Sequence, residues 1–179
     1  MLHHRIWDPF LRVFHWALVV GFIANALYTN PEGALHHDLG YVLAALIALR
    51  LVWGVFGPRS AKFSSFIPSP AALMGHLSDI ATGRKKVHLG HSPLGALMIL
   101  NLLLSIALIA VTGYMLTTDA YWGAGWVESL HETLVIWAGV SAGIHVGAVI
   151  WESLRTGVNL PRAMITGVKD IPQDANIVP

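Results

Sequence analysis

Four long apolar stretches constrain the fold of this chain more than any other feature. They run over about residues 10–28, 39–57, 93–117 and 133–151, and none contains Asp or Glu. Each has the roughly 20 residues that a helix needs to cross a bilayer. Apolar residues make up 55% of the 179 residues and charged residues only 12%, which is more apolar surface than a domain of this size can bury in water. The sequence therefore predicts an all-α fold, an integral membrane four-helix bundle in lipid. We expect a single domain over residues 1–179 with a loose tail over about 170–179.

The Lys and Arg residues all fall on one side of these stretches. They are Arg5, Arg12, Arg50, Arg59, Lys62, Arg84, Lys85, Lys86, Arg155, Arg162 and Lys169. The first connection, 29–38, and the third, 118–132, contain none. Because an excess of Lys and Arg marks short cytoplasmic loops, we expect both termini to be cytoplasmic.

The connection between the second and third stretches, 58–90, is too long for a simple turn. Within it, residues 71–82 place apolar side chains on one stripe, followed by Gly83 and three basic residues, 84–86. This periodicity predicts a short amphipathic helix that lies in the membrane interface. We expect His76, on the same segment, to be solvated.

The sequence has ten histidines and no cysteine. The lack of cysteine excludes disulfides, thiolate zinc sites, iron–sulfur clusters and covalent haem attachment through Cys-x-x-Cys-His. A net charge of +1 argues against nucleic acid as a partner. Ionisable residues within a membrane are costly and usually functional, so the histidines in the apolar stretches need an explanation.

Histidines on three of the stretches form two depth-matched pairs. His131 opens the fourth stretch and His145 follows 14 residues later. Fourteen residues rise about 21 Å and stop roughly 40° short of four turns, a difference that a left-handed bundle nearly removes. Both side chains are therefore expected to point into the bundle, one near each leaflet. We expect His15 level with His145, and either His36 or His37 level with His131.

Such pairs are typical of a porphyrin iron held by two neutral imidazoles from facing helices. Gly40, one turn after His36, would leave room for the flat ring. Arg50, 14 residues after His36, would lie near the inner pair and bind haem propionates; snorkelling to the headgroups is the equal alternative. A histidine-lined metal transporter is a competing function, although cation pathways normally recruit membrane carboxylates as well.

Several short motifs along the chain form a recognisable set. They are Phe14-His15-Trp16, His36-x-x-x-Gly40-Tyr41, Arg50-Leu51-Val52-Trp53-Gly54, Gly90-His91-Ser92-Pro93-Leu94-Gly95, Leu130-His131-Glu132 and Ile144-His145-Val146. From about Trp7 to Gly167, the set resembles the bacterial cytochrome b561 family, which includes the b-type cytochrome subunits of nickel–iron hydrogenases.

The resemblance implies a di-haem b protein of the bacterial inner membrane that transfers electrons between the quinone pool and a redox partner. His15 and His145 would hold the inner haem iron, and His36 and His131 the outer one. The family has a histidine four residues before the Gly-Tyr pair, which favours His36 over His37. A quinone is a further candidate cofactor, and a quinone-linked superoxide oxidase is the alternative function.

Two further expectations concern the ends of the bundle. His91, at the cytoplasmic start of the third stretch, is a candidate to hydrogen-bond an inner propionate or to anchor the helix end. The outer connections carry only acidic charges, at Glu32, Asp38, Asp119, Glu128 and Glu132. A negative surface attracts positive partners and repels anions, so we expect a periplasmic redox protein with a basic surface.

Overall fold

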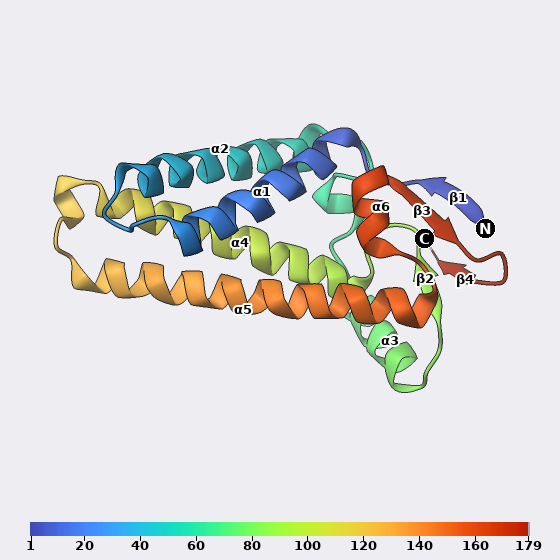
Figure 1. The fold of residues 1–179 in the computed structure, drawn as a ribbon. Helices are drawn as coiled ribbons and strands as arrows, with labels where there is room; N and C mark the ends of the chain where they lie inside the picture. The colour runs from blue at the N-terminus through green and yellow to red at the C-terminus, as the bar shows by residue number, and fades with distance from the viewer. Residues whose placement is uncertain (179) are drawn as a thin grey trace.

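A computed structural model describes residues 1–178 and shows four long helices in one bundle (Figure 1). The helices are α1 (Pro9–Tyr28), α2 (Ala34–Phe56), α4 (Pro93–Leu116) and α5 (Gly125–Thr156), and each is long and apolar enough to cross a membrane. The predicted helical membrane bundle is confirmed. The fourth helix extends beyond the apolar stretch 133–151 at both ends, so His131 lies inside α5 rather than at its start.

Local sequence signals fix where these helices begin and end. The Asp8 carboxylate accepts a hydrogen bond from the backbone N–H of Leu11 at 3.1 Å, and the Ser92 hydroxyl accepts one from Gly95 at 3.2 Å. A proline follows each of these two caps, where its missing N–H costs nothing. Helix α5 ends at Gly157, whose φ of 73° is the left-handed conformation that glycine adopts most readily.

Within the bundle, the membrane helices that follow one another along the chain make the closest contacts. Helix α4 packs between α2 and α5, and α1 packs on α2, whereas α1 and α5 make little contact with each other. We call the boundary between α1 and α5 the seam. Phe14 of α1, Ile47 of α2 and Leu103 of α4 meet in the buried core of the bundle.

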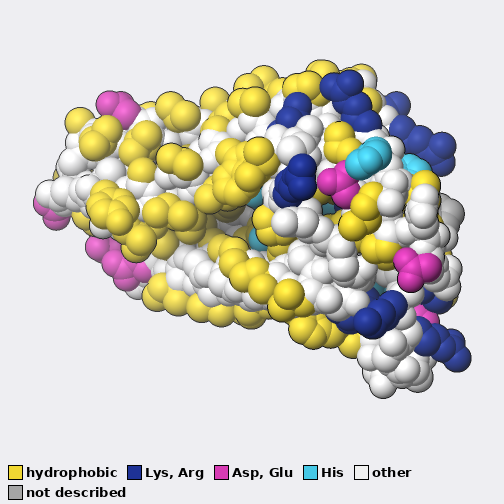
Figure 2. Space-filling view, turned by 45° about the vertical axis from the view of Figure 1, so that its right-hand side comes forward, with side chains coloured by type: hydrophobic (Ala, Val, Ile, Leu, Met, Phe, Trp, Pro, Cys, Tyr) yellow, Lys and Arg dark blue, Asp and Glu magenta, His cyan; other side chains and the backbone are white. Residues whose placement is uncertain are grey.

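The surface of the bundle matches a lipid environment. On the face shown in Figure 2, apolar side chains cover the length of the helices, and Lys and Arg gather at the end that carries both termini. The charged side chains at the opposite end of that face are acidic. We call these two ends the basic end and the acidic end. Large side chains such as Val13, Leu104 and Ile136 are 61–69% exposed along the helices, which water would penalise and lipid does not.

Short elements form a cap at the basic end. Strand β1 (Leu2–Arg5) pairs antiparallel with β3 (Val168–Ile171), and β2 (Lys86–His88) pairs parallel with β4 (Asn176–Val178). Helix α6 (Leu160–Thr166) precedes β3, and single 3-10 turns, η1 and η2, lie at Phe63–Ser65 and Asp119–Tyr121.

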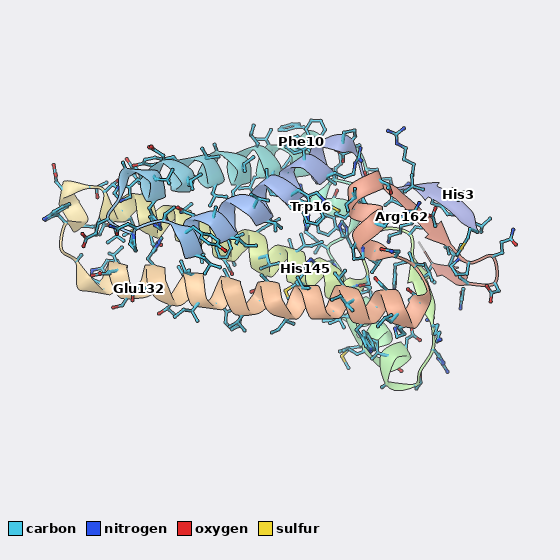
Figure 3. All side chains as sticks on the ribbon, viewed as in Figure 1. His3, Phe10, Trp16, Glu132, His145 and Arg162 are labelled. Atoms are coloured by element: carbon cyan, nitrogen blue, oxygen red, sulfur yellow. The ribbon has the colours of Figure 1, made fainter. Side chains whose placement is uncertain are left out.

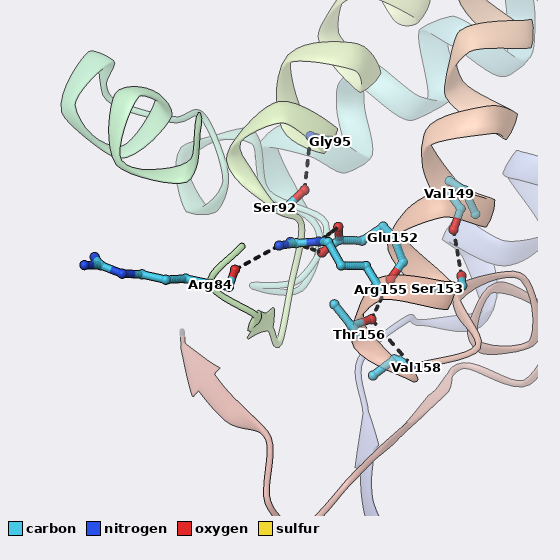
Figure 4. A network of polar contacts seen from close by, with 9 residues as sticks. All are labelled: Arg84, Ser92, Gly95, Val149, Glu152, Ser153, Arg155, Thr156 and Val158. Atoms are coloured by element: carbon cyan, nitrogen blue, oxygen red, sulfur yellow. Dashed lines mark hydrogen bonds and ion pairs between the residues drawn. The ribbon is translucent and has the colours of Figure 1, made fainter. Parts of the chain in front are cut away.

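The expectation of a loose tail over about 170–179 is wrong for its described part, 170–178. Strands β3 and β4 tie this segment into the cap. The physical reason is burial, because Val87, Val158 and Ile171 form a small core of their own at this end. Next to this core, three hydrogen bonds of Arg155 join α5 to the segment before β2: its guanidinium donates twice to Glu152, both at 2.9 Å, and once to the Arg84 carbonyl at 2.9 Å (Figure 4).

The connection between α2 and α4 contains the expected helix, α3 (Pro70–Ala81). Met74 and Leu77 of the apolar stripe are 65% and 41% exposed, so this stripe faces outward. The side that packs against the protein carries His76 and Asp79, both buried. The expectation of a solvated His76 is therefore wrong. The carboxylate of Asp79 pairs with Lys86 at 2.7 Å, and this ion pair links the polar face of α3 to β2.

Candidate functional site

The structure brings His36 and His131 together at the acidic end. Their ring centroids lie 6.4 Å apart and their planes are inclined by 70°. His36 lies in the first turn of α2, on the opposite side of the bundle from α5, which carries His131. Of the two neighbouring histidines, His36 is half-buried and His37 is exposed. The pair that the structure forms is thus His36 with His131.

The separation of the two rings suits one metal ion between them. Two imidazoles on opposite sides of an ion, each with a metal–nitrogen bond of about 2 Å, place their ring centroids about 6 Å apart. The separation of His36 and His131, at 6.4 Å, is close to this value.

A threonine hydroxyl contacts the Nδ1 atom of each of these two rings. Thr29 Oγ1 lies 2.9 Å from Nδ1 of His36, and Thr112 Oγ1 lies 3.0 Å from Nδ1 of His131. Each hydroxyl donates to the backbone carbonyl four residues earlier in its own helix, at 2.6 and 2.8 Å respectively. A hydroxyl has a single hydrogen, so each threonine accepts from the ring, and the Nε2 atom keeps its lone pair.

Two glycines border the His36 and His131 pair. A Cβ atom at Gly113 of α4 would lie 3.1 Å from Cε1 of His131, which is a tight contact, so glycine lets this ring lie against α4. At Gly40, where the sequence predicts space for a ring, a Cβ atom would meet only the Asn25 side chain, at 4.0 Å. The room predicted at Gly40 stays a prediction, and the structure adds Gly113, which the sequence analysis missed.

The second histidine pair lies across the seam. His15 of α1 and His145 of α5 are close enough for an electrostatic interaction. The His15 ring makes an edge contact with Trp16, with centroids 5.1 Å apart, and Figure 3 shows Trp16 and His145 at the same level along the bundle. Nδ1 of His15 is buried and has no hydrogen-bond partner among residues 1–178.

Arg50 is buried rather than extended to the surface. Arg50 is only 3% exposed, and its guanidinium lies 4.7 Å from the centre of the Phe63 ring. Gly54 makes room for this ring, because a Cβ atom there would overlap Phe63. One terminal nitrogen of Arg50 is buried without a hydrogen-bond partner in the described chain, although the Asp8 carboxylate contributes a favourable electrostatic interaction.

His91 lies just before α4, between two aromatic rings. Its ring centroid is 4.5 Å from that of Trp7 and 4.7 Å from that of Phe66. Burial, together with the nearby charges of Lys169 and Arg50, lowers the pKa of His91 to about 3, so the ring is neutral at physiological pH.

Lys169 fastens the loop that carries His91. Its ammonium donates to the carbonyls of His88 and Gly90, at 2.9 and 2.8 Å. Burial lowers the pKa of this lysine to about 8. The β3 strand thereby fixes the position of the residues that precede α4.

A polar bridge joins α4 and α5 between the two histidine pairs. The Asn101 amide donates to the Ser141 hydroxyl at 2.9 Å and accepts from the Trp137 indole at 3.0 Å. No group of three or more His, Asp or Glu side chains placed to hold a metal ion occurs within residues 1–178. The histidines come as pairs on facing helices, which is what a planar ligand with two open axial positions requires.

A protein-family model described as prokaryotic cytochrome b561 matches residues 6–167. The chain belongs to this family. No curated protein and no solved structure matches it. Membership makes the chain a multi-pass membrane cytochrome with b-type haem, and its function is transmembrane electron transfer in a quinone-linked family.

The cytochrome contains functional candidates that sequence reasoning did not identify. Thr29, Thr112 and Gly113 contact the candidate haem ligands. The signal available was weak, because a threonine that hydrogen-bonds to its own helix backbone is common. Their significance depends on which ring from another element lies beside them.

Proposed function

We propose that this cytochrome transfers electrons across the membrane through two b-type haems, each held by two histidines. His36 and His131 hold the outer haem iron, and His15 and His145 the inner one. The observation that carries this proposal is the His36–His131 geometry: rings 6.4 Å apart, each with its Nδ1 atom engaged by a threonine. In both rings Nε2 is the nitrogen left for a ligand.

The inner site has features that fit the same cofactor. The helices that carry His15 and His145 make little direct contact with each other, although the two imidazoles interact electrostatically, which fits two ligands of one group between these helices. Arg50 has a buried nitrogen without a partner, and a buried guanidinium is costly unless an anion pairs with it. A haem propionate is such an anion, and His91 lies close enough to Arg50 to interact with it electrostatically.

The protein contributes ligands, burial and charge to this chemistry, while bound haem supplies the one-electron reaction. Four histidines on three helices set the two haems at two depths. Two imidazoles per iron leave no open coordination position, so a quinone would dock at the bundle surface and not at the metal. The apolar helices exclude water from the path between the two sites.

We further propose that the basic end is cytoplasmic and that the electrons pass between the quinone pool and a periplasmic redox protein with a basic surface. The positive-inside rule supports the orientation. The acidic residues at the acidic end support the partner, since Glu32, Asp38, Asp119, Glu128 and Glu132 are all exposed. Superoxide, as an anion, would be repelled from this surface.

A reduced-minus-oxidised absorption spectrum with a haem-to-protein ratio tests the proposal. We expect two haems per chain, and we expect each of His36→Ala, His131→Ala, His15→Ala and His145→Ala to retain about half of the haem, because one imidazole cannot keep iron six-coordinate. A double variant within one pair should lose no more than its single variants. His37→Ala is the matched control and should retain both haems.

Three results would contradict the proposal. A colourless, folded protein would exclude haem. Loss of the outer haem in His37→Ala, with its retention in His36→Ala, would mean that His37 and not His36 is the ligand on α2. Loss of both haems in every single variant would mean that the four histidines do not form two independent sites.

A further inference from the structure

The two threonines of the outer site form a symmetric arrangement that the proposed ligand set does not require. Thr29 ends α1 and contacts His36 of α2, while Thr112 lies within α4 and contacts His131 of α5. The two contacts come from different helices, yet their geometry is the same. In both, the hydroxyl donates to its own backbone and is left to accept from a ring Nδ1 atom.

Together with the backbone carbonyls of Asn25 beside His36 and Ile109 beside His131, this arrangement favours one tautomer of each imidazole. A neutral histidine carries one ring proton, and the acceptor at Nδ1 places that proton there. The lone pair is then on Nε2, which is the atom free to bind a metal. A hydrogen bond from Nδ1 also makes the ring a stronger electron donor, because it shifts negative charge toward the ring.

The inner site lacks the same feature at one of its ligands. Nδ1 of His15 is buried and has no hydrogen-bond partner within the described chain. Thr112, by contrast, is 4% exposed, so its contact with His131 is shielded from water. The two pairs therefore differ in their surroundings although all four ligands are histidines.

We propose that Thr29 and Thr112 are positioning residues that fix the outer histidines as Nε2 ligands and lower the reduction potential of the outer haem. The proposal rests on the proposed function. A stronger donor stabilises the ferric iron relative to the ferrous iron, so the two hydroxyls make the outer haem harder to reduce than it would be without them. The inner haem, with His15 unsupported, is not tuned in this way.

Thr133 provides a matched control for a purely structural role. It lies on α5 close to His131, and its hydroxyl donates to the carbonyl of Ser129, four residues earlier, at 2.7 Å. Like Thr112, Thr133 therefore donates to a backbone carbonyl of its own helix. None of its hydrogen bonds involves a histidine. If the threonines only support their helices, Thr112→Val and Thr133→Val should behave alike.

The experiment is a redox titration of the purified two-haem protein, followed by absorption. In Thr112→Val and in Thr29→Val we expect the ratio of oxidised to reduced outer haem at a fixed potential to fall by about tenfold, which is about 59 mV for one electron. The inner haem should titrate as in the wild type. The two shifts should add in the double variant, because each acts through a separate ligand, and Thr112→Ser should restore the wild-type value.

A second measurement does not depend on bound haem. In the haem-free protein with 15N-labelled histidine, side-chain nitrogen chemical shifts report which ring nitrogen is protonated. We expect His36 and His131 to be protonated at Nδ1, and we expect Thr112→Val to change the His131 signal alone. This readout keeps the proposal testable if a valine variant fails to retain haem.

The outcomes separate this proposal from the proposed function. An outer-haem potential that is the same in Thr112→Val, Thr133→Val and the wild type would refute the positioning role while leaving the two-haem function intact. An Nε2-protonated His131 in the haem-free protein would also refute it. A wild-type protein without an outer haem would instead refute the proposed function.

Discussion

Acidification should destabilise this protein through His91, and the structure gives the size of the effect. The pKa of His91 is about 3 in the folded chain against a usual value of 6.5. Below pH 6.5, His91 therefore binds a proton in the unfolded chain but stays neutral in the folded chain. The free energy of unfolding consequently falls as the pH falls. Between pH 6.5 and pH 5 the difference is about 1.5 pKa units, or about 2 kcal/mol at about 1.36 kcal/mol per unit.

Thermal unfolding of the purified protein at pH 7 and pH 5 measures this contribution. A loss of about 2 kcal/mol corresponds to a decrease of about 4–8 °C in Tm for a chain of this size. His91→Gln has a polar side chain of similar size that does not titrate. Between the two pH values, the Tm of this variant should therefore fall by about 4–8 °C less than the Tm of the wild type. His37→Gln, at an exposed position of the opposite end, is the control.

The reasoning would be refuted by a His91→Gln protein with the same dependence of Tm on pH as the wild type. That result would mean that His91 is protonated without cost between Trp7 and Phe66. It would also mean that the charges of Lys169 and Arg50 do not act on this ring.

Three other predictions concern charge and polarity. Arg50→Gln should lower the midpoint potential of one haem and leave the other nearly unchanged, since a buried positive charge favours the reduced, less positive cofactor; unchanged potentials at both haems would place Arg50 outside the haem environment. Asn101→Leu should cost about 1 kcal/mol of stability with unaltered haem spectra, because it removes the hydrogen bond to Ser141 and leaves both histidine pairs intact; differential scanning fluorimetry measures it. Stopped-flow reoxidation of the reduced protein by a basic cytochrome c should slow steeply with added salt, whereas haem reduction by superoxide should be slow. Rapid reduction by superoxide with quinone as acceptor would favour the oxidase alternative.

The four membrane helices could be predicted because apolar composition alone defines a span. The first and last residues of α5 could not be predicted in this way. Its first turns contain Glu128 and its last turns Glu152 and Arg155, and a hydropathy criterion stops at such residues although the helix continues into the polar boundary. The cap was missed for a different reason. Strands β1 and β3 are four residues each, too short to show a period, and they pair across 163 or more residues of chain.

The candidate site was predictable where spacing along one helix decides which side chains share a face. The interval from His131 to His145 is of this kind. The contacts of Thr29, Thr112 and Gly113 depend on how far one helix is shifted along its neighbour, and a single sequence does not contain that shift. The choice of His36 over His37 lies between these cases, since one turn of α2 presents both. The family resemblance favoured His36, and the structure places its ring 6.4 Å from that of His131.

The seam between α1 and α5 has a consequence for how the protein is assembled. The inner histidines, His15 and His145, belong to two membrane helices that make little contact with each other in the polypeptide. Under the proposed function, the inner haem is therefore the contact that joins the first and the last membrane helix. The contacts of α1 with α2, α2 with α4 and α4 with α5 do not involve the cofactor, so these helices can pack before haem arrives. Removal of the inner haem should then free α1 from α5 and leave the contacts of α2 with α4 in place.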